Sequence, residues 1–259
     1  MPSVVIAASF GGPEVLSVVE EPAIEPGPGQ ARIAVRAAGV NPVDYKSYSG
    51  AFGTDPARLP VRPGLEAAGL MLTGVTAWHA LAATDVHEGD TVLIHGAAGG
   101  VGLMAVQLAT GRGATPVATA SPAKHGFLRD LGAVPVAYGP GLAGRVRAAM
   151  PGGLDAALDL IGTDEAVDVS LELVTDRARI ATIAAPAHGL EVGIKVLGGA
   201  PGADPGTQIR DAARLELARL AHDRALRVFV TQTFPLAGAA DAHRASMDGH
   251  TTGKIVLLP

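Results

Sequence analysis

One segment of the chain, residues 91–110, constrains the possible folds more than any other. It opens with the apolar, β-branched run Thr91-Val92-Leu93-Ile94, which predicts a buried strand. A glycine-rich turn follows, and apolar residues at helical spacing come next. Glycines allow a backbone to approach a pyrophosphate closely, and a helix N-terminus offers unpaired N–H groups and the positive end of the helix dipole. The strand–turn–helix order therefore predicts a phosphate cradle for a dinucleotide, formed by Gly96, Ala97, Gly99, Gly100, Val101 and Gly102. Tight packing alone is the alternative explanation for these glycines.

Composition narrows the class of protein. The hydrophobic fraction of 48% predicts a substantial core, and the aromatic fraction of 3% makes that core mainly aliphatic. A net charge of −5 argues against nucleic acid or an anionic membrane as the main partner. The absence of cysteine excludes disulfides and thiolate metal sites, and it fits a reducing compartment, so we predict a cytoplasmic protein. No apolar stretch is long and uninterrupted enough to predict a membrane span.

Helix and strand patterns alternate from about residue 73 onward. This alternation predicts an α/β fold with a Rossmann-type, doubly wound parallel sheet. Segments 194–197 and 227–231 are predicted to extend that sheet, with a helix at 207–223 between them. The predicted strands are 91–95, 115–119, 134–138, 154–161 and 178–185, and the predicted helices are 74–83, 100–110, 122–131, 142–149 and 164–174.

The first part of the chain is predicted to be β-rich, with strands at 4–8 and 31–37. Residues 41–63 contain many prolines and glycines and are predicted to be irregular. A helix at 236–247 and a strand at 254–258 are predicted to close the chain.

The end of the second predicted strand of the parallel sheet indicates which dinucleotide binds. An acid roughly 20 residues after the glycines usually holds the ribose 2′-OH of NAD. Here Thr119 is followed by Ala120, Ser121 and, three residues later, Lys124, with no acid before Asp130. Ser121 and Lys124 could bind a 2′-phosphate, so NADP(H) is the predicted cofactor. The alternatives are that Ser121 caps the next helix and that Lys124 is a solvated lysine.

Gly162 follows another predicted strand of this sheet. Ligands bind at the carboxyl ends of such strands, so Gly162 is predicted to line the cofactor site. A simple strand-ending turn is the alternative.

Ordered motifs along nearly the whole chain resemble one family. They are AGVNPVDYK at 38–46, PGLEAAG at 63–69, LTGVTAW at 72–78, HGAAGGVG at 95–102, FPLAGAADAH at 234–243 and GKIVLLP at 253–259. In this order they resemble the medium-chain dehydrogenase/reductase superfamily, and within it the zinc-free quinone oxidoreductase branch. The resemblance implies a partial GroES-like catalytic domain at 1–69, a Rossmann NADP-binding domain at 70–228, and a return segment to the catalytic domain at 229–259.

Two departures from the zinc-dependent relatives stand out. Those relatives carry a His-Glu pair where this chain has Leu65-Glu66, and leucine cannot bind a metal, so no metal site is predicted. In the family, a long stretch completes the barrel after PGxExAG, whereas here Gly69 runs directly into Leu70-Met71-Leu72-Thr73. The barrel is therefore expected to be incomplete, and the sequence leaves open whether this shortening is natural or artificial.

The resemblance also implies a reaction, in which hydride passes from NADPH to a quinone or an α,β-unsaturated carbonyl. It places Asn41, Tyr45 and Tyr48 in a loop over the nicotinamide, where they could contact the substrate, and it places Thr73 and Lys254 near the cofactor. Each has an ordinary alternative: Asn41 could start a turn, the tyrosines could be packing residues, Thr73 could cap a helix, and Lys254 could lie on a surface strand.

Other functions remain open from the sequence. A non-catalytic NADPH-binding protein and a biosynthetic tailoring enzyme on the same fold are the two alternatives to the reductase. The resemblance further implies a homodimer, formed through residues 194–197 as an edge strand.

Overall fold

The computed structural model describes residues 1–30, 32–64, 66, 70–249 and 251–259. It divides into two compact units. The first unit combines Met1–Leu72 with Val228–Pro259, and the second is Thr73–Arg227. The second unit carries the glycine-rich turn.

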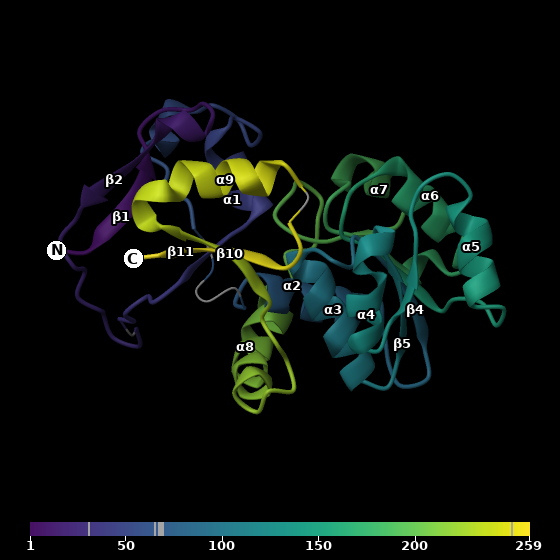
Figure 1. The fold of residues 1–259 in the computed structure, drawn as a ribbon. Helices are drawn as coiled ribbons and strands as arrows, with labels where there is room; N and C mark the ends of the chain where they lie inside the picture. The colour runs from purple at the N-terminus through teal and green to yellow at the C-terminus, as the bar shows by residue number, and fades with distance from the viewer. Residues whose placement is uncertain (31, 65, 67–69, 250) are drawn as a thin grey trace. The chain divides into compact units, whose positions relative to one another are not determined.

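A six-stranded parallel sheet forms the second unit, in the order β6-β5-β4-β7-β8-β9 (Figure 1). This order confirms the predicted doubly wound α/β fold, because the chain starts in the middle of the sheet and winds outward in both directions. The strands are β4 (Thr91–His95), β5 (Thr115–Thr119), β6 (Val134–Val136), β7 (Ala156–Asp159), β8 (Ile180–Thr182) and β9 (Lys195–Val196).

Helices cover both faces of this sheet. The α3 helix packs against β4 and β5 and also contacts α2, while α6 packs against β7 and β8 and also contacts α5 (Figure 1). The strands are short apolar runs buried on both faces, as parallel strands between helices must be. The helices of this unit are α2 (Thr73–Ala83), α3 (Gly100–Gly111), α4 (His125–Asp130), α5 (Leu142–Ala149), α6 (Asp164–Leu173), α7 (Pro186–Glu191) and α8 (Thr207–His222).

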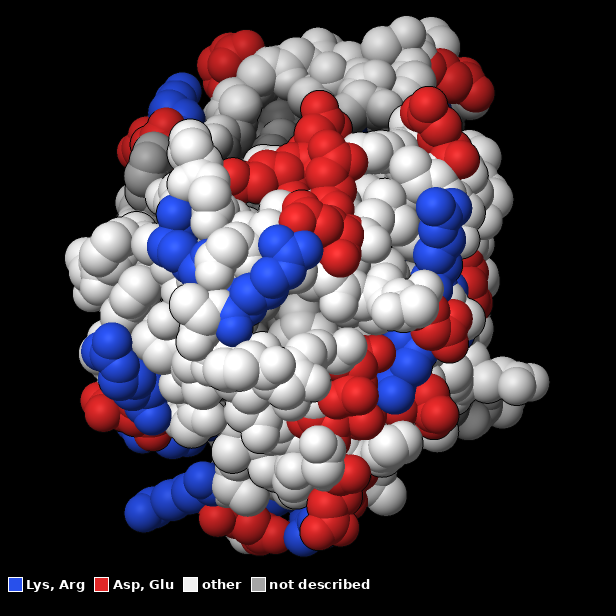
Figure 2. All heavy atoms as spheres, turned by 90° about the vertical axis from the view of Figure 1, so that its right-hand side faces the viewer, with Lys and Arg blue, Asp and Glu red and all other residues white. Residues whose placement is uncertain are grey.

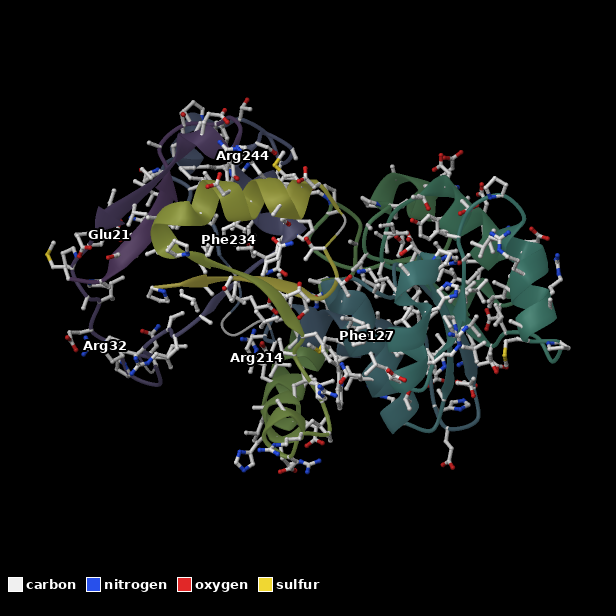
Figure 3. The ribbon with its side chains drawn as sticks, viewed as in Figure 1. Glu21, Arg32, Phe127, Arg214, Phe234 and Arg244 are labelled. Carbon is white, nitrogen blue, oxygen red and sulfur yellow. The ribbon has the colours of Figure 1, made fainter. Side chains whose placement is uncertain are left out.

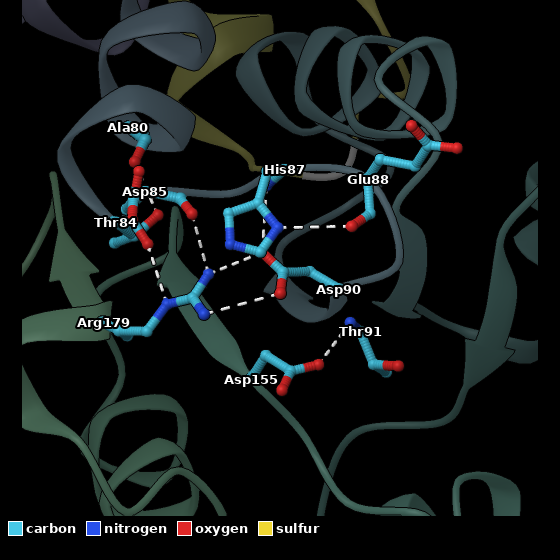
Figure 4. Close-up of polar contacts among 9 residues, drawn as sticks. All are labelled: Ala80, Thr84, Asp85, His87, Glu88, Asp90, Thr91, Asp155 and Arg179. Carbon is cyan, nitrogen blue, oxygen red and sulfur yellow. Dashed lines mark hydrogen bonds and ion pairs between the residues drawn. The ribbon is translucent and has the colours of Figure 1, made fainter.

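An ion pair ties the amino end of the parallel sheet to the preceding loop. Arg179 Nη2 lies 2.6 Å from Asp90 Oδ2, and the same guanidinium donates to the carbonyl oxygens of Thr84 and Asp85 (Figure 4). Asp90 also accepts a hydrogen bond from the backbone N–H of His87. These bonds hold the pKa of the Asp90 carboxyl below its usual range against the opposing effect of burial.

In its described residues, the first unit contains two small sheets, two α-helices and three short 3-10 helices. Strands β1 (Ser3–Ala7) and β2 (Leu16–Glu20) form an antiparallel pair. Strands β10 (Val230–Pro235), β11 (Lys254–Leu258) and β3 (Ala38–Val40) form the other sheet. The helices are α1 (Pro42–Tyr48) and α9 (Ala239–Met247). Phe234 on β10 packs with the core cluster to which α9 contributes Ala239 and Ala242, while Arg244 of α9 pairs with Asp241 (Figure 3).

Three sequence-based predictions about this first unit were wrong. Residues 32–37 form no strand and are largely exposed, because no strand among the described residues pairs with them. Ala31 lies outside the described residues. Residues 227–231 do not extend the parallel sheet, because β10 pairs with β11. Residues 41–63 are not wholly irregular: Asn41 and Asp44 form a capping box that starts α1, with Pro42 in its first turn.

Charged residues of both signs are interspersed on the surface. On the face shown in Figure 2, basic side chains are scattered and acidic side chains gather near the upper centre. The described residues on that face therefore form no continuous basic surface of the kind that binds nucleic acid. In the described part of the chain, no helix is both long enough and apolar enough to cross a membrane.

Candidate functional site

The glycine-rich turn between β4 and α3 has the geometry of a phosphate cradle. Gly96 has a φ of +70°, a conformation that side chains rarely allow. A Cβ on Gly102 would lie 2.3 Å from the carbonyl oxygen of Gly96, so only glycine fits at position 102. Gly99 is the N-cap of α3, and the first N–H groups of a helix have no partner within the helix. The turn therefore presents backbone donors at the positive end of α3, the arrangement that a pyrophosphate requires.

The carboxyl ends of the neighbouring strands border this turn. The backbone N–H of Ala97 donates to the carbonyl oxygen of Thr119 at the end of β5, with a distance of 3.2 Å. Gly162, after β7, has a φ of +84°, and a Cβ there would lie 2.8 Å from the carbonyl oxygen of Ala184, after β8. The loops after these strands therefore lie at one edge of the sheet, where a doubly wound fold binds its ligand.

The end of β5 carries the residues predicted to distinguish the two dinucleotides. Ser121 is the N-cap of the 3-10 turn Pro122–Lys124, and its side chain makes no capping hydrogen bond. The Ser121 hydroxyl and the partly exposed Lys124 follow the strand without an intervening acid. Nothing at this strand end repels a 2′-phosphate, so the residues present fit NADP(H) better than NAD(H).

Two further buried polar residues, Asp159 and Thr182, lie at this edge. Asp159 ends β7 and has no exposed surface; its carboxylate accepts hydrogen bonds from the N–H groups of Ile161 and Gly162 and from the hydroxyl of Thr182. Thr182 ends β8 and is equally buried. The sequence held a signal for them, because each is a polar residue that ends an otherwise apolar strand.

His95 ends β4 and is 1% exposed. Its ring nitrogens lie 3.4 Å from Thr119 Oγ1 and 3.2 Å from Ser170 Oγ. Burial lowers the pKa of His95 to about 4, so the imidazole is neutral at physiological pH. His95 therefore acts here as a hydrogen-bonding core residue.

In the first unit, Asn41, Glu66 and Lys254 form a buried polar cluster. Lys254 Nζ lies 2.6 Å from Glu66 Oε2 and also donates to Asn41 Oδ1. Asn41 Nδ2 donates to Glu66 Oε2 at 3.0 Å, and Glu66 Oε1 accepts from the backbone N–H of Leu72. Asn41 is 4% exposed and Lys254 is 3% exposed. Asn41 and Lys254 are predicted site residues that the structure brings together from distant parts of the sequence. Glu66, the third member of the cluster, was not among the predicted site residues.

Asp44 lies beside this cluster. Its Oδ2 accepts from the backbone N–H of Asn41 at 2.7 Å, while its Oδ1 is buried without a hydrogen-bond partner among the described residues. Burial, with a contribution from the neighbouring Glu66 charge, raises the pKa of Asp44 to about 6.

The two tyrosines of α1 differ in exposure. Tyr48 has no exposed surface, and its hydroxyl lies 2.8 Å from His243 Nδ1. Burial raises the pKa of Tyr48 and lowers that of His243 to about 4, so both are uncharged near neutral pH. The packing alternative suits Tyr48, whereas Tyr45 is only partly buried. Thr73, the first residue of α2 in the second unit, is 2% exposed.

The donor set does not suit a metal ion. The chain has no cysteine, and Leu65, which replaces the histidine of the zinc-dependent relatives, lies outside the described residues. Among the described residues, His, Asp and Glu nowhere gather in groups of three that could hold a metal. The prediction that the protein works without zinc stays a prediction.

Comparisons with known proteins agree with this architecture. Residues 27–135 match the family model of the alcohol dehydrogenase GroES-like domain, and residues 131–257 match the model of zinc-binding dehydrogenases. A quinone oxidoreductase of Pseudomonas aeruginosa is 29% identical over 320 aligned positions, which take in 97% of this chain and 98% of the relative. Because that alignment is longer than this chain of 259 residues, the relative contains segments that have no counterpart here.

Two further similarities extend the comparison. The solved quinone oxidoreductase of Thermus thermophilus, also known in complex with NADPH, superposes with a TM-score of 0.80 at 28% identity, covering 100% of both chains. A spectinabilin polyketide synthase system protein of Streptomyces orinoci is 33% identical over 250 aligned positions, which take in 78% of this chain but 10% of that much longer protein. With the parallel sheet, the glycine cradle and the returning C-terminal strand, these matches establish that the chain belongs to the medium-chain dehydrogenase/reductase superfamily.

Proposed function

We propose that this protein is a reductase that uses NADPH to reduce a quinone or another α,β-unsaturated carbonyl. The observation that carries the proposal is the cradle at Gly96–Gly102 beside a β5 end without an acid, in a chain whose full-length relative is a quinone oxidoreductase. The solved relative that binds NADPH shares the fold over its whole length.

NADPH, when bound, would supply the hydride. Gly100, Val101 and Gly102 would donate backbone N–H groups to the pyrophosphate, and Ser121 and Lys124 would hold the 2′-phosphate. Protein residues in such reductases orient the cofactor and exclude water from the reacting atoms. Tyr45, which is partly exposed, is the proposed donor to the substrate oxygen, in preference to the buried Tyr48.

A biosynthetic reductase is the second candidate. The observation that favours it is the match to the polyketide synthase system protein of Streptomyces orinoci, at higher identity than the stand-alone quinone oxidoreductase but over a shorter part of this chain. Such an enzyme would reduce a conjugated thioester in place of a quinone, with the same cofactor site.

We further propose that the protein is cytoplasmic, and we treat the homodimer through residues 194–197 as a separate hypothesis. The edge strand β9 already has partners on both sides: Leu197 N–H donates to the Thr182 carbonyl, and the Val196 carbonyl accepts from Asp204 N–H at 2.8 Å. A dimer through this strand would therefore have to displace the Asp204 backbone. Light scattering on the purified protein measures the oligomeric state directly.

The reductase is tested with purified protein. NADPH binding is measured by fluorescence titration, and NADPH oxidation is measured with a panel of quinones, enones and conjugated thioesters. Binding with turnover supports the proposal, and the preferred acceptor distinguishes the two candidates. Binding without turnover would indicate a non-catalytic NADPH-binding protein. Absence of NADPH binding would overturn the proposed function.

A further inference from the structure

Four buried polar residues form a row across the parallel sheet. Thr119, His95, Asp159 and Thr182 are the last residues of β5, β4, β7 and β8, which are consecutive strands in the sheet. His95 pairs with Asp159, and Asp159 pairs with Thr182. Residues in register on neighbouring parallel strands point to the same face, so this polar row lies on one face of the sheet.

The polar row sits at the end of an apolar core. Two residues earlier on the same strands lie Leu93, Val117, Ala157 and Ile180, all members of one buried cluster. None of the four polar residues is more than 3% exposed. Burying polar groups in such a place costs free energy unless each has a hydrogen-bond partner, so a complete row at this position calls for an explanation.

Each member of the row stands immediately before a loop of the candidate cofactor site. Gly96 follows His95, Ala120 and Ser121 follow Thr119, and the turn with Gly162 follows Asp159. Thr182 precedes the Ile183–Ala185 segment, whose Ala184 carbonyl leaves no room for a Cβ on Gly162.

The hydrogen bonds of Asp159 and Thr182 have a single consistent direction. Asp159 Oδ1 accepts from the N–H groups of Ile161 and Gly162 at 3.0 and 2.8 Å. Asp159 Oδ2 accepts the hydroxyl proton of Thr182 at 2.6 Å, which leaves Thr182 Oγ1 to accept from the N–H groups of Ala184 and Ala185. One carboxylate and one hydroxyl thus fix the backbones of two adjacent loops.

The hydrogen bonds of His95 also follow one direction. Ser170 Oγ donates its proton to the Ala166 carbonyl at 2.7 Å, so it can only accept from His95 Nε2. His95 is then protonated at Nε2, and its Nδ1 accepts from the Thr119 hydroxyl. All the hydrogen bonds described for these four residues are made to groups of the second unit.

We infer that Asp159 and Thr182 are positioning residues for the dinucleotide: they hold the loops after β7 and β8 in the shape that binds it. The inference rests on the proposed function. Loops that are already ordered before binding lose less entropy when the ligand arrives, so loss of this order weakens binding without changing the hydride-transfer step.

The test uses substitutions that keep size and change hydrogen bonding. Asp159→Asn replaces one acceptor oxygen with an NH₂ group, which can only donate. In one orientation that group faces the N–H donors of Ile161 and Gly162. In the other it faces the Thr182 hydroxyl, whose two lone pairs already accept from Ala184 and Ala185. Thr182→Val keeps the shape and removes the hydroxyl, and Thr182→Ser restores it. Asp90→Asn is the matched control: Asp90 is a buried, hydrogen-bonded carboxylate of the same unit, and it lies at the opposite end of the sheet beside Arg179 (Figure 4).

NADPH dissociation constants come from fluorescence titration, with kcat and KM measured alongside and thermal unfolding recorded for every variant. We expect Asp159→Asn and Thr182→Val each to raise the dissociation constant about tenfold, with kcat at saturating NADPH within about twofold of wild type. The double variant Asp159→Asn/Thr182→Val should bind NADPH no more weakly than the weaker of the two single variants, because each substitution disrupts the same hydrogen-bond network. Thr182→Ser should bind as wild type does, and Asp90→Asn should lose stability but not affinity.

The outcomes separate this inference from the proposed function. If wild type binds NADPH and Thr182→Val, folded, binds it equally well, the positioning role is overturned while the proposed function stands. Equal losses of affinity in Asp90→Asn and Asp159→Asn would also overturn it, because they would reflect general destabilisation. If wild type binds no NADPH, the proposed function fails and this inference fails with it.

Discussion

Lys254 and Glu66 form a buried ion pair with Nζ and Oε2 separated by 2.6 Å, and the side chains are 3% and 0% exposed. Asn41 bridges them, donating to the carboxylate and accepting from the ammonium. Removal of one member of such a pair leaves an uncompensated charge in the core, whereas removal of both can be nearly neutral.

The first prediction concerns this pair. Lys254→Met should lower the free energy of unfolding by about 3–5 kcal/mol, because the Glu66 carboxylate stays buried without its cation. Glu66→Gln combined with Lys254→Met should recover a large part of that loss. Urea unfolding of the single and double variants measures both effects. A loss below about 1 kcal/mol for Lys254→Met would mean that the pair is not buried in solution.

The pH dependence of stability should report Asp44. In the unfolded chain Asp44 ionises near pH 4, but in the folded protein its pKa is about 6. Between these values the folded state binds more protons, so Asp44 makes stability fall as the pH rises, by up to about 3 kcal/mol.

Asp44→Asn keeps an acceptor for the Asn41 N–H and should remove this fall. His95 and His243 act in the opposite direction, because their lowered pKa values of about 4 make stability decline as the pH drops below about 6.5. The difference between Asp44→Asn and wild type, measured by urea unfolding from pH 4 to pH 7, cancels the histidine contributions. If the difference in free energy of unfolding between Asp44→Asn and wild type is the same at every pH from 4 to 7, the raised pKa of Asp44 is contradicted.

Tyr48 should prove structural. Its hydroxyl is committed to His243 in the core, so Tyr48→Phe should cost about 1–3 kcal/mol of stability. The kcat should stay within about twofold of wild type. Tyr45→Phe is the matched variant on the same helix, at a partly exposed position. A hundredfold loss of kcat in folded Tyr48→Phe would instead support the substrate role that the sequence left open.

The glycine cradle can be probed with a single methyl group. A Cβ on Gly102 would meet the Gly96 carbonyl oxygen at 2.3 Å, whereas a Cβ on Gly111, in the same helix, would meet nothing within 4 Å. Gly102→Ala should therefore weaken NADPH binding at least tenfold. Gly111→Ala should bind normally and should be stabilised by about 0.5–1 kcal/mol, as alanine is favoured over glycine in helices. Equal NADPH affinity of the two variants would argue that the turn does not hold the pyrophosphate.

Cofactor preference should depend on Lys124. Lys124→Glu should raise the KM for NADPH about tenfold or more and leave the KM for NADH within about twofold, because only NADPH carries the 2′-phosphate. Arg129→Glu, an equal charge change at an exposed position on α4, is the control. If both variants discriminate equally against NADPH, the effect is one of net charge and not of a contact.

Local patterns were sufficient to find the strands of the parallel sheet and its cradle, although residues 227–231 were wrongly added to that sheet. The strand at Thr91–His95 and the helices at Thr73–Ala83 and Leu142–Ala149 follow from hydrophobic periodicity and flanking glycines, which act over a few residues. The requirement for glycine at position 102 could likewise be predicted from the sequence, because the motif implies that two backbone segments approach closely there.

Tertiary structure alone decided the rest. A strand was predicted at 31–37 from composition, but residues 32–37 pair with no strand in the described part of the chain. A strand depends on its neighbours as much as on its own residues. Asn41 and Lys254 meet across 213 positions of sequence, and Tyr48 and His243 meet across 195. The sequence identified polar residues of the right chemical type at most of these positions. Long-range packing decides which of these residues face each other in the water-free interior, and so which of them carry a charge or a proton there. No local sequence pattern encodes that packing.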